Sequence, residues 1–207
     1  MDNKTNLTIL TVVNKSRRDD GLRLLERESK KLKFLNPKTL LVDDCSSYLE
    51  YNRRSVMELS DYFDTDFCLI VQFDGKVINP NAWTDNFLKY DYIGAPWAFF
   101  GMLRYHQKEN PTNKDYLVGN GGFCLRSKKL YSALKEIAND YTDENEDVYI
   151  CQKKRDVLEK MGIKFAPFDV AKKFSVENQI YNGQFGAHKE IFSYQNGIFK
   201  RHSIEEL

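Results

Sequence analysis

The chain has 207 residues, of which 42% are hydrophobic and 14% aromatic, and its formal net charge is +1. This length and composition predict one packed domain and exclude an extended disordered chain. Because the net charge is close to zero, no overall basic field indicates a nucleic-acid-binding protein.

No stretch approaches 18 consecutive apolar residues, and the amino terminus lacks the apolar segment of a signal peptide. Four cysteines are scattered without C-x-x-C spacing, which favours buried free thiols over disulfides or a zinc site. We therefore expect a soluble, cytoplasmic protein with no integral membrane segment.

Apolar runs and amphipathic segments alternate in the first third of the chain. The apolar runs predict three strands, at residues 7–13, 39–42 and 67–73. Leu22, Leu25 and Leu32 recur near helical spacing and predict a helix over residues 20–33. The order strand–helix–strand–helix–strand is typical of a mostly parallel central sheet flanked by helices, an α/β fold.

The second of these helices carries its own start signal. Ser47 and Glu50 have the spacing of a capping box, and Leu49, Val56 and Phe63 share one face of a helix that extends to about residue 62.

The rest of the chain is less regular. We expect a short helix at 79–88, a strand and turn at 90–97, a loop or lid at 99–115, a glycine-interrupted strand at 118–125, helices at 127–139 and 146–161, and a strand at 163–166. The tail from Phe174 is expected to be irregular.

Polar side chains follow each of the three predicted strands. Asn14 follows the first, Asp43 and Asp44 follow the second, and Gln72 and Asp74 follow the third. The carboxyl ends of parallel strands meet at one edge, where open α/β sheets bind ligands. Asp74 is therefore the first candidate for a residue that handles a metal or a phosphate. The alternative is an ordinary Asp-Gly turn.

Three further features carry possible chemistry. The glycine-rich segment 119–122 predicts a floor for a sugar or a diphosphate, or alternatively a β-bulge or turn. Glu146 and Asp147 begin a predicted helix, where the helix dipole favours acidic residues, and either is also a candidate general base. His188 is either structural or, with Asp74, one side of a mixed site for manganese or magnesium.

These blocks, in this order, resemble glycosyltransferases of the A fold. Residues 42–46, 51–54 and 72–74 are similar to motifs of the large inverting family that includes cellulose and chitin synthases. The second half is similar to a family of uncharacterised glycosyltransferase-like domains from bacteria and large viruses, through residues 91–97, 119–123, 146–147, 174–177 and 185–188.

The resemblance implies one glycosyltransferase-like domain over residues 1–207. Its nucleotide-binding half would span about 7–76, its acceptor-binding half about 77–190, and a tail about 191–207. The implied reaction moves a sugar from a nucleotide-diphosphate sugar to a hydroxyl of a glycan or other acceptor, with inversion, as in polysaccharide biosynthesis. The implied cofactor is Mn²⁺ or Mg²⁺.

The resemblance also implies roles for individual residues. Asp147, or its neighbour Glu146, would be the catalytic base, and Asp74 and His188 would bind the metal. The donor or acceptor sugar would contact Trp97, Asn120, Gly121 and Gly122. The nucleotide would contact Val13, Asn14, Asp43, Asp44, Arg53, Arg54 and Gln72.

Gln72 departs from the family pattern, because it replaces the first aspartate of the Asp-x-Asp motif. A neutral amide at this position leaves two alternatives open: a metal-independent mechanism, and a non-catalytic module that binds a glycan or a nucleotide. A nucleotidyltransferase that makes the sugar nucleotide is the third alternative. Such enzymes usually carry a glycine-rich segment directly after the first strand, where residues 14–19 contain no glycine.

Overall fold

A computed structural model describes residues 6–99, 102–103 and 113–204. Its central sheet has five strands in the order β2-β1-β3-β8-β5. Their bounds are β1 Leu7–Val12, β2 Lys38–Val42, β3 Phe67–Val71, β5 Tyr92–Gly94 and β8 Phe123–Ser127. Strand β1 pairs in parallel with β2 and β3, whereas β8 is antiparallel to β3 and β5. The predicted α/β class is confirmed, with a sheet that is mixed: the parallel part is its amino-terminal half.

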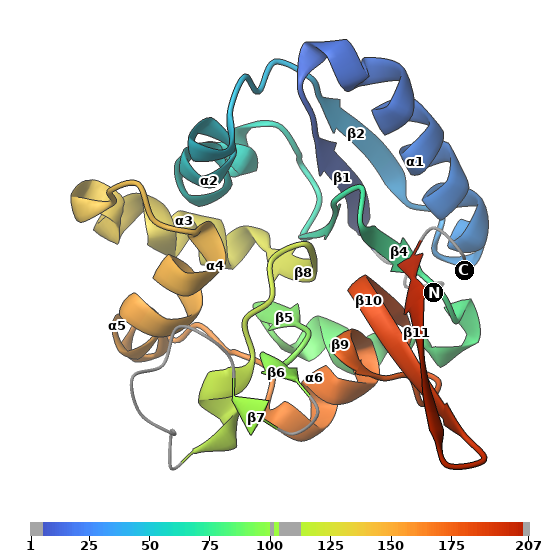
Figure 1. Cartoon of the computed structure of the whole chain (residues 1–207). Coiled ribbons are helices and arrows are strands. Elements are labelled where there is room, and N and C mark those ends of the chain that lie inside the picture. Colours follow the sequence, from blue (N-terminus) through green and yellow to red (C-terminus); the bar gives the residue numbers. More distant parts are fainter. Residues whose placement is uncertain (1–5, 100–101, 104–112, 205–207) are drawn as a thin grey trace, which may run out of the picture.

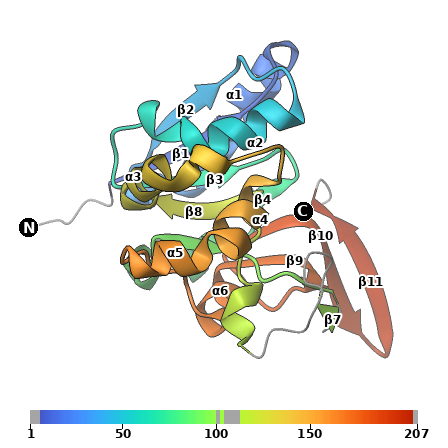
Figure 2. The ribbon, with the colours of Figure 1, turned by 90° about the vertical axis from the view of Figure 1, so that its left-hand side faces the viewer.

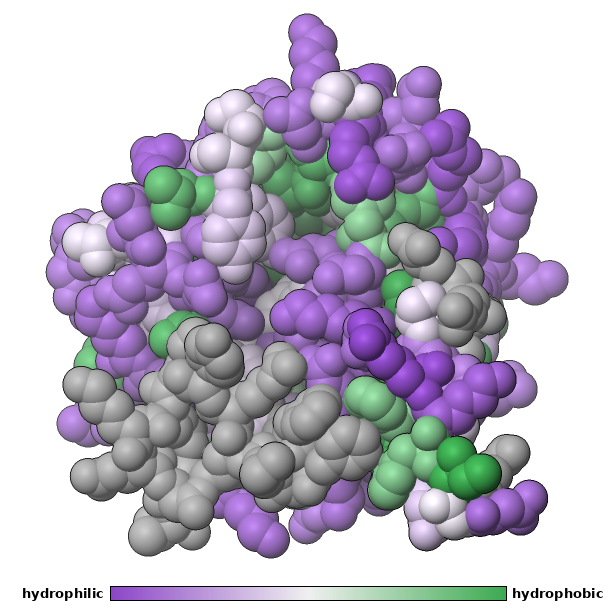
Figure 3. Space-filling model, in the orientation of Figure 1, coloured by the Kyte–Doolittle hydropathy of each residue, from purple (hydrophilic) through white to green (hydrophobic). Residues whose placement is uncertain are grey.

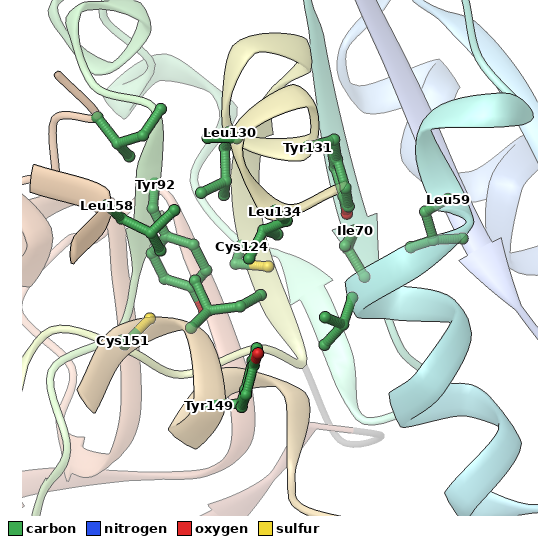
Figure 4. Packing of buried hydrophobic residues seen from close by; sticks show 14 of the residues in the cluster. Leu59, Ile70, Tyr92, Cys124, Leu130, Tyr131, Leu134, Tyr149, Cys151 and Leu158 are labelled. Carbon is green, nitrogen blue, oxygen red and sulfur yellow. The ribbon is translucent and has the colours of Figure 1, made fainter. Parts of the chain in front are cut away.

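Helices cover both faces of this sheet (Figures 1 and 2). They are α1 Arg18–Lys31, α2 Tyr48–Met57, α3 Lys128–Ile137, α4 Glu146–Val148, α5 Arg155–Lys160 and α6 Phe168–Phe174. Side chains of a strand alternate between the two faces, so Cys68 and Ile70 of β3 join one apolar cluster while Leu69 and Val71 join the other. The first cluster packs against α2, α3 and α5 (Figure 4). The sheet is therefore buried on both sides, which explains its nearly continuous apolar runs.

A second sheet combines one short strand after β3 with strands from the carboxyl-terminal part of the chain. Its strands are β4 Gly75–Val77, β9 Ser175–Ile180, β10 Gly186–Gln195 and β11 Ile198–Ser203. Strand β10 pairs with all three others. Because β4 begins directly after Asp74, this sheet starts at the tip of β3 (Figure 1). In a short separate hairpin, β6 Ala98–Phe99 pairs with β7 Met102–Leu103.

The prediction of an irregular tail after Phe174 was wrong. Strands β10 and β11 form a hairpin through Asn196 and Gly197, both with positive φ (51° and 82°). Asn-Gly is the preferred pair for such a two-residue turn, so the sequence carried the signal of this hairpin.

Several other predicted elements differ in detail. Residues 79–88 form two 3₁₀ turns, Pro80–Ala82 and Asp85–Lys89, in place of one helix. The helix predicted at 146–161 is divided by a π-helical turn at Tyr149–Lys153. The glycines at 119–122 precede β8, and the strand predicted at 163–166 is reduced to one bridge between Phe165 and Tyr92.

The capping box predicted at the start of α2 is confirmed. Ser47 caps α2 by accepting a hydrogen bond from the Glu50 amide (3.1 Å), and the Glu50 carboxylate accepts one from the Ser46 amide (2.7 Å). However, Leu22 and Leu49 are 46% and 51% exposed, so neither lies on the buried face predicted for its helix.

The four cysteines are free and buried, as predicted. Among the described residues no helix is long and apolar enough to cross a membrane. Most of the loop predicted at 99–115 lies outside the described residues.

Candidate functional site

Two adjoining cavities lie at the carboxyl ends of β1 and β3. Each has a volume of about 490 Å³, and they share Tyr48, Gln72 and Asp74. Because β8 is antiparallel to β3, the glycines before β8 meet the same edge of the sheet. Hydrophilic residues cover the centre of the face shown in Figure 3. The strand ends thus converge where the sequence predicted a ligand site.

The first cavity lies between the strand ends and the start of α2. Its lining combines hydroxyl and amide side chains with aromatic rings. Its lining residues are Val12, Val13, Asn14, Cys45, Ser46, Ser47, Tyr48, Tyr51, Gln72, Phe73 and Asp74. The Arg17 guanidinium lies 3.6 Å from the centre of the ring of Phe73, one of these lining residues.

The second cavity is lined mainly by charged and amide side chains. Its lining residues are Tyr48, Gln72, Asp74, Trp97, Asn120, Gly122, Asn145, Glu146, Asp147, Glu177, His188 and Lys189. It joins residues that follow β3 and precede β8 with residues of α4 and of strands β9 and β10. The predicted sugar-contacting residues Trp97, Asn120 and Gly122 therefore share this cavity with both predicted metal ligands.

His188 lies between two carboxylates. Its Nε2 is 3.0 Å from Asp74 Oδ1, and its Nδ1 is 3.3 Å from Glu177 Oε1. Burial alone would lower the pKa of His188, but hydrogen bonding and charge attraction to Asp74 and Glu177 outweigh burial and raise it to about 9. Burial likewise opposes ionisation of Glu177, yet His188 and Lys189 lower its pKa to about 2. The two carboxylates thus stabilise the charged form of the imidazole.

The donor atoms of Asp74 and His188 suit a divalent cation. Oxygen and imidazole nitrogen both bind Mn²⁺, at bond lengths that place neighbouring ligand atoms about 3 Å apart. Among the described residues no group of three or more His, Cys, Asp or Glu side chains forms a complete metal site. A cation between Asp74 and His188 would thus need further oxygen ligands, such as those of a diphosphate.

Close packing explains the glycine at position 122. A Cβ atom there would lie 2.0 Å from His188 Nε2, closer than any Cβ contact allows. The preceding Asn120 fixes the same ring from the other side, because its Nδ2 is 3.0 Å from His188 Nδ1. The glycine segment is therefore the surface on which the imidazole rests.

Glu146 and Asp147 have different environments although they are adjacent. Glu146 is 3% exposed and pairs with Arg126 at 3.0 Å, and Arg126 is itself fully buried. Asp147 Oδ2 accepts a hydrogen bond from the Gly121 amide (3.1 Å). Burial and the negative charge of Glu146 raise the pKa of Asp147 to about 7. Glu146 is thus a counter-ion, whereas Asp147 has the pKa of a general base that works near neutral pH.

Four predicted nucleotide-binding residues do not line either cavity. Asp43 pairs with Arg18, and Asp44 pairs with Arg54. Arg53 lies on the exposed side of α2 and pairs with Glu58 at 2.7 Å. The remaining three, Val13, Asn14 and Gln72, line the first cavity.

Several cavity residues escaped the sequence reasoning. Tyr48 and Tyr51 are at helical spacing on α2, a pattern that also describes ordinary core residues. Glu177 and Lys189 lie in the segment predicted to be irregular, so their strand pairing was not foreseen. Arg126, in an apolar strand, was the available signal of a buried counter-charge, because buried arginine is rare without a partner.

A larger hollow of about 1100 Å³ lies away from these residues, beside α6 and β9. The described residues that line it include no carboxylate and no histidine. They are Ala82, Phe168, Lys172, Lys173, Gln179, Ile180, Asn182, Gly183, Gln184 and Phe199. Despite its size, this hollow has no carboxylate or imidazole among its described lining residues, so the two smaller cavities are the stronger candidates for the site.

Comparison with known proteins finds one family and a solved structure of similar fold. Residues 43–192 match the sequence profile of a family described as protein of unknown function (DUF5672). No curated protein matches the chain. A crystal structure of a glycosyltransferase involved in the glycosylation of the major capsid of PBCV-1 is similar, with a TM-score of 0.56, over 88% of this chain and 91% of that chain. The two sequences are 12% identical, so this likeness concerns the fold alone.

Proposed function

The chain belongs to the DUF5672 family, and we propose that it is a glycosyltransferase that moves a sugar from a nucleotide-diphosphate sugar to an acceptor hydroxyl. One observation carries the proposal: a cavity lined by aromatic rings and amides adjoins a cavity that contains Asp147, and the Asp74–His188 pair lies beside their junction. The likeness in fold to a glycosyltransferase supports the same reaction class.

We place the nucleoside of the donor in the first cavity. Its volume of about 490 Å³ is within the range of small-molecule sites. The rings of Tyr48, Tyr51 and Phe73 offer surfaces for a base, while Asn14 and Gln72 offer amides for hydrogen bonds. The shared residues Gln72 and Asp74 then lie next to the diphosphate.

The diphosphate would lie beside Asp74 and His188. We propose that these two residues hold Mn²⁺ or Mg²⁺, which, when bound, would neutralise the negative charge that develops on the leaving diphosphate. The neutral amide of Gln72 removes one carboxylate from this junction, so the protein itself repels the diphosphate less than an Asp-x-Asp pair would.

The acceptor would bind in the second cavity, with its hydroxyl beside Asp147. An ionised Asp147 takes the hydroxyl proton as the oxygen attacks the anomeric carbon, and the bond to the diphosphate breaks on the opposite side. This in-line geometry inverts the anomeric centre. Trp97 lines this cavity and would stack on a sugar ring. The Asn120 amide already contacts His188 and accepts a hydrogen bond from the Gly122 amide, so it would act by holding the imidazole in place.

A binding module without turnover is the second candidate, and Gln72 is the observation that favours it. Such a module would bind a sugar nucleotide in the same cavities but would not release the nucleoside diphosphate. Cleavage of the donor therefore separates the two candidates.

A thermal-shift screen tests the donor site. UDP, GDP, ADP, CDP and their sugar conjugates are added with and without MnCl₂. At 100 times its dissociation constant, a ligand stabilises the folded state by roughly 2.7 kcal/mol, or about 5–10 °C in Tm for a chain of this size. We expect at least one nucleotide to give this shift, and the shift to be larger with manganese.

The matched control is Asp74→Asn, which keeps the size of the side chain and removes its charge. We expect manganese to add little to the nucleotide shift of this variant. No shift with any nucleotide would reject the proposed donor site.

A further inference from the structure

We infer that Lys189 is a further catalytic residue of this site, which binds the leaving diphosphate through its ammonium group. This inference rests on the proposed function and adds to it a protein cation on the diphosphate. It begins from a backbone feature of the two strands that carry the site.

Strands β9 and β10 are irregular at the same level of their pairing. Glu177 pairs with His188 in register, and the residues that follow them, Asn178 and Lys189, have φ angles of 50° and 59°. The pairing register then shifts before Ile191. The two left-handed residues thus lie side by side, directly after Glu177 and His188.

Lys189 is the exception among the non-glycine residues of positive φ in the described part of the chain. The others are Asn36, Asn178 and Asn196, and asparagine tolerates the left-handed region far better than lysine. Backbone strain of this kind concentrates at functional sites, where the surrounding structure maintains it. The position of Lys189 therefore points to a role for its side chain.

The irregularity directs the lysine side chain into the site. In a regular strand, side chains of consecutive residues point to opposite faces, so Lys189 would point away from a cavity that His188 lines. A bulge redirects one of them, and both residues line the second cavity. The Lys189 amide is fixed by a hydrogen bond to the Asp74 carbonyl oxygen (2.7 Å). The same turn that holds Lys189 is therefore attached to the proposed metal ligand.

The cavity provides a reason for a cation at this point. Asp74, Glu146, Asp147 and Glu177 all line it. Arg126 already pairs with Glu146, whereas the Lys189 ammonium lies 2.9 Å from Glu177 Oε1 with its side chain 47% exposed. An exposed ammonium is free to turn from Glu177 towards an entering anion. A diphosphate, which offers several charged oxygens, is the anion that the proposed reaction supplies.

The test compares Lys189→Met, Lys189→Gly and Lys189→Arg with the wild type. The affinity for whichever of UDP, GDP, ADP or CDP binds the wild type is measured by calorimetry, beside the corresponding nucleoside monophosphate. We expect Lys189→Met and Lys189→Gly to bind the diphosphate about tenfold to hundredfold more weakly. The monophosphate lacks the β-phosphate to which the sugar is attached in the donor, so its affinity should change by less than about threefold. Lys189→Arg should restore most of the lost affinity.

The backbone argument gives a second readout. Glycine accepts a φ of 59° without strain, so Lys189→Gly should have a Tm equal to or above that of Lys189→Met. Two controls match the changes: Lys200→Met removes an exposed strand lysine, and Asn196→Gly replaces a left-handed residue in the β10–β11 turn. Neither should alter diphosphate affinity.

Two failures are distinguishable. If the wild type binds no nucleoside diphosphate, the proposed function itself fails. If the wild type binds one and Lys189→Met and Lys189→Gly bind it equally well, only the assignment of Lys189 is overturned. An equal loss for diphosphate and monophosphate would also overturn it, because that result indicates a general change of the site.

Discussion

Replacing Asp147 with asparagine is expected to lower the turnover number of sugar transfer by about 10²–10⁴, the usual contribution of a general base. The amide keeps the shape of the side chain but cannot accept the acceptor proton. Asp147 does not line the first cavity, where we propose that the nucleoside binds, so the nucleotide-induced thermal shift should persist in this variant. Activity is measured as release of nucleoside diphosphate from the donor in the presence of acceptor.

The pH dependence of kcat/KM tests the same role of Asp147. A base acts in its ionised form, and the pKa of Asp147 is raised to about 7 by burial and by Glu146. The value of kcat/KM in the wild type should therefore fall about tenfold per pH unit below pH 7 and level off above it. The Asp147→Asn variant should lack this acidic limb.

Asp143→Asn is the matched control, because Asp143 is exposed on the same acidic segment and lines neither cavity. It should retain the turnover number and the pH profile of the wild type. A turnover number for Asp147→Asn within about threefold of the wild type would contradict the assignment of the base.

Replacing Arg126 with methionine is expected to destabilise the folded protein by about 3–5 kcal/mol, because it leaves the buried Glu146 carboxylate without its partner. Arg126 also donates hydrogen bonds to the Ser55 carbonyl oxygen (3.3 Å) and to Cys124 Sγ (3.2 Å), and both are lost. For a chain of this size the change corresponds to a fall in Tm of roughly 10 °C. The measurement is urea unfolding at pH 7, with Tm as a second readout.

Two companion variants separate the buried pair from a general effect of losing an arginine. Arg53→Met breaks an exposed pair with Glu58, which should cost at most about 1 kcal/mol. The double variant Arg126→Met with Glu146→Leu removes both buried charges and should recover much of the loss. If Arg126→Met unfolds at the same urea concentration as Arg53→Met, Glu146 does not depend on Arg126.

Sequence reasoning works well where one signal decides one local structure. The runs that became β1 and β3 are apolar because both faces of the sheet are buried. The Ser47–Glu50 signal located the start of α2 for an equally local reason. Asp74 was recognisable as a candidate because it directly follows an apolar run of strand length, and Asp147 because it begins a predicted helix.

The arrangement of the site could not be predicted in the same way, because it depends on contacts between segments that are distant in the sequence. Asp74 and His188 are 114 residues apart, and β10 brings them within 3.0 Å. Asp44 matched a nucleotide-binding motif by position, but the pairing of its side chain with Arg54 is decided by how α2 packs. The different environments of Glu146 and Asp147 in α4 likewise depend on Arg126, which lies in strand β8 and pairs with Glu146.

Release of nucleoside diphosphate from a panel of sugar nucleotides, with manganese and with wild-type and Asp147→Asn protein, tests the central claim most directly. The proposed glycosyltransferase should cleave at least one donor well above the rate without protein, and Asp147→Asn should lose that activity while still binding the nucleotide. Binding of a sugar nucleotide without cleavage of any donor, with or without added glycan acceptors, would contradict the claim and identify a binding module instead.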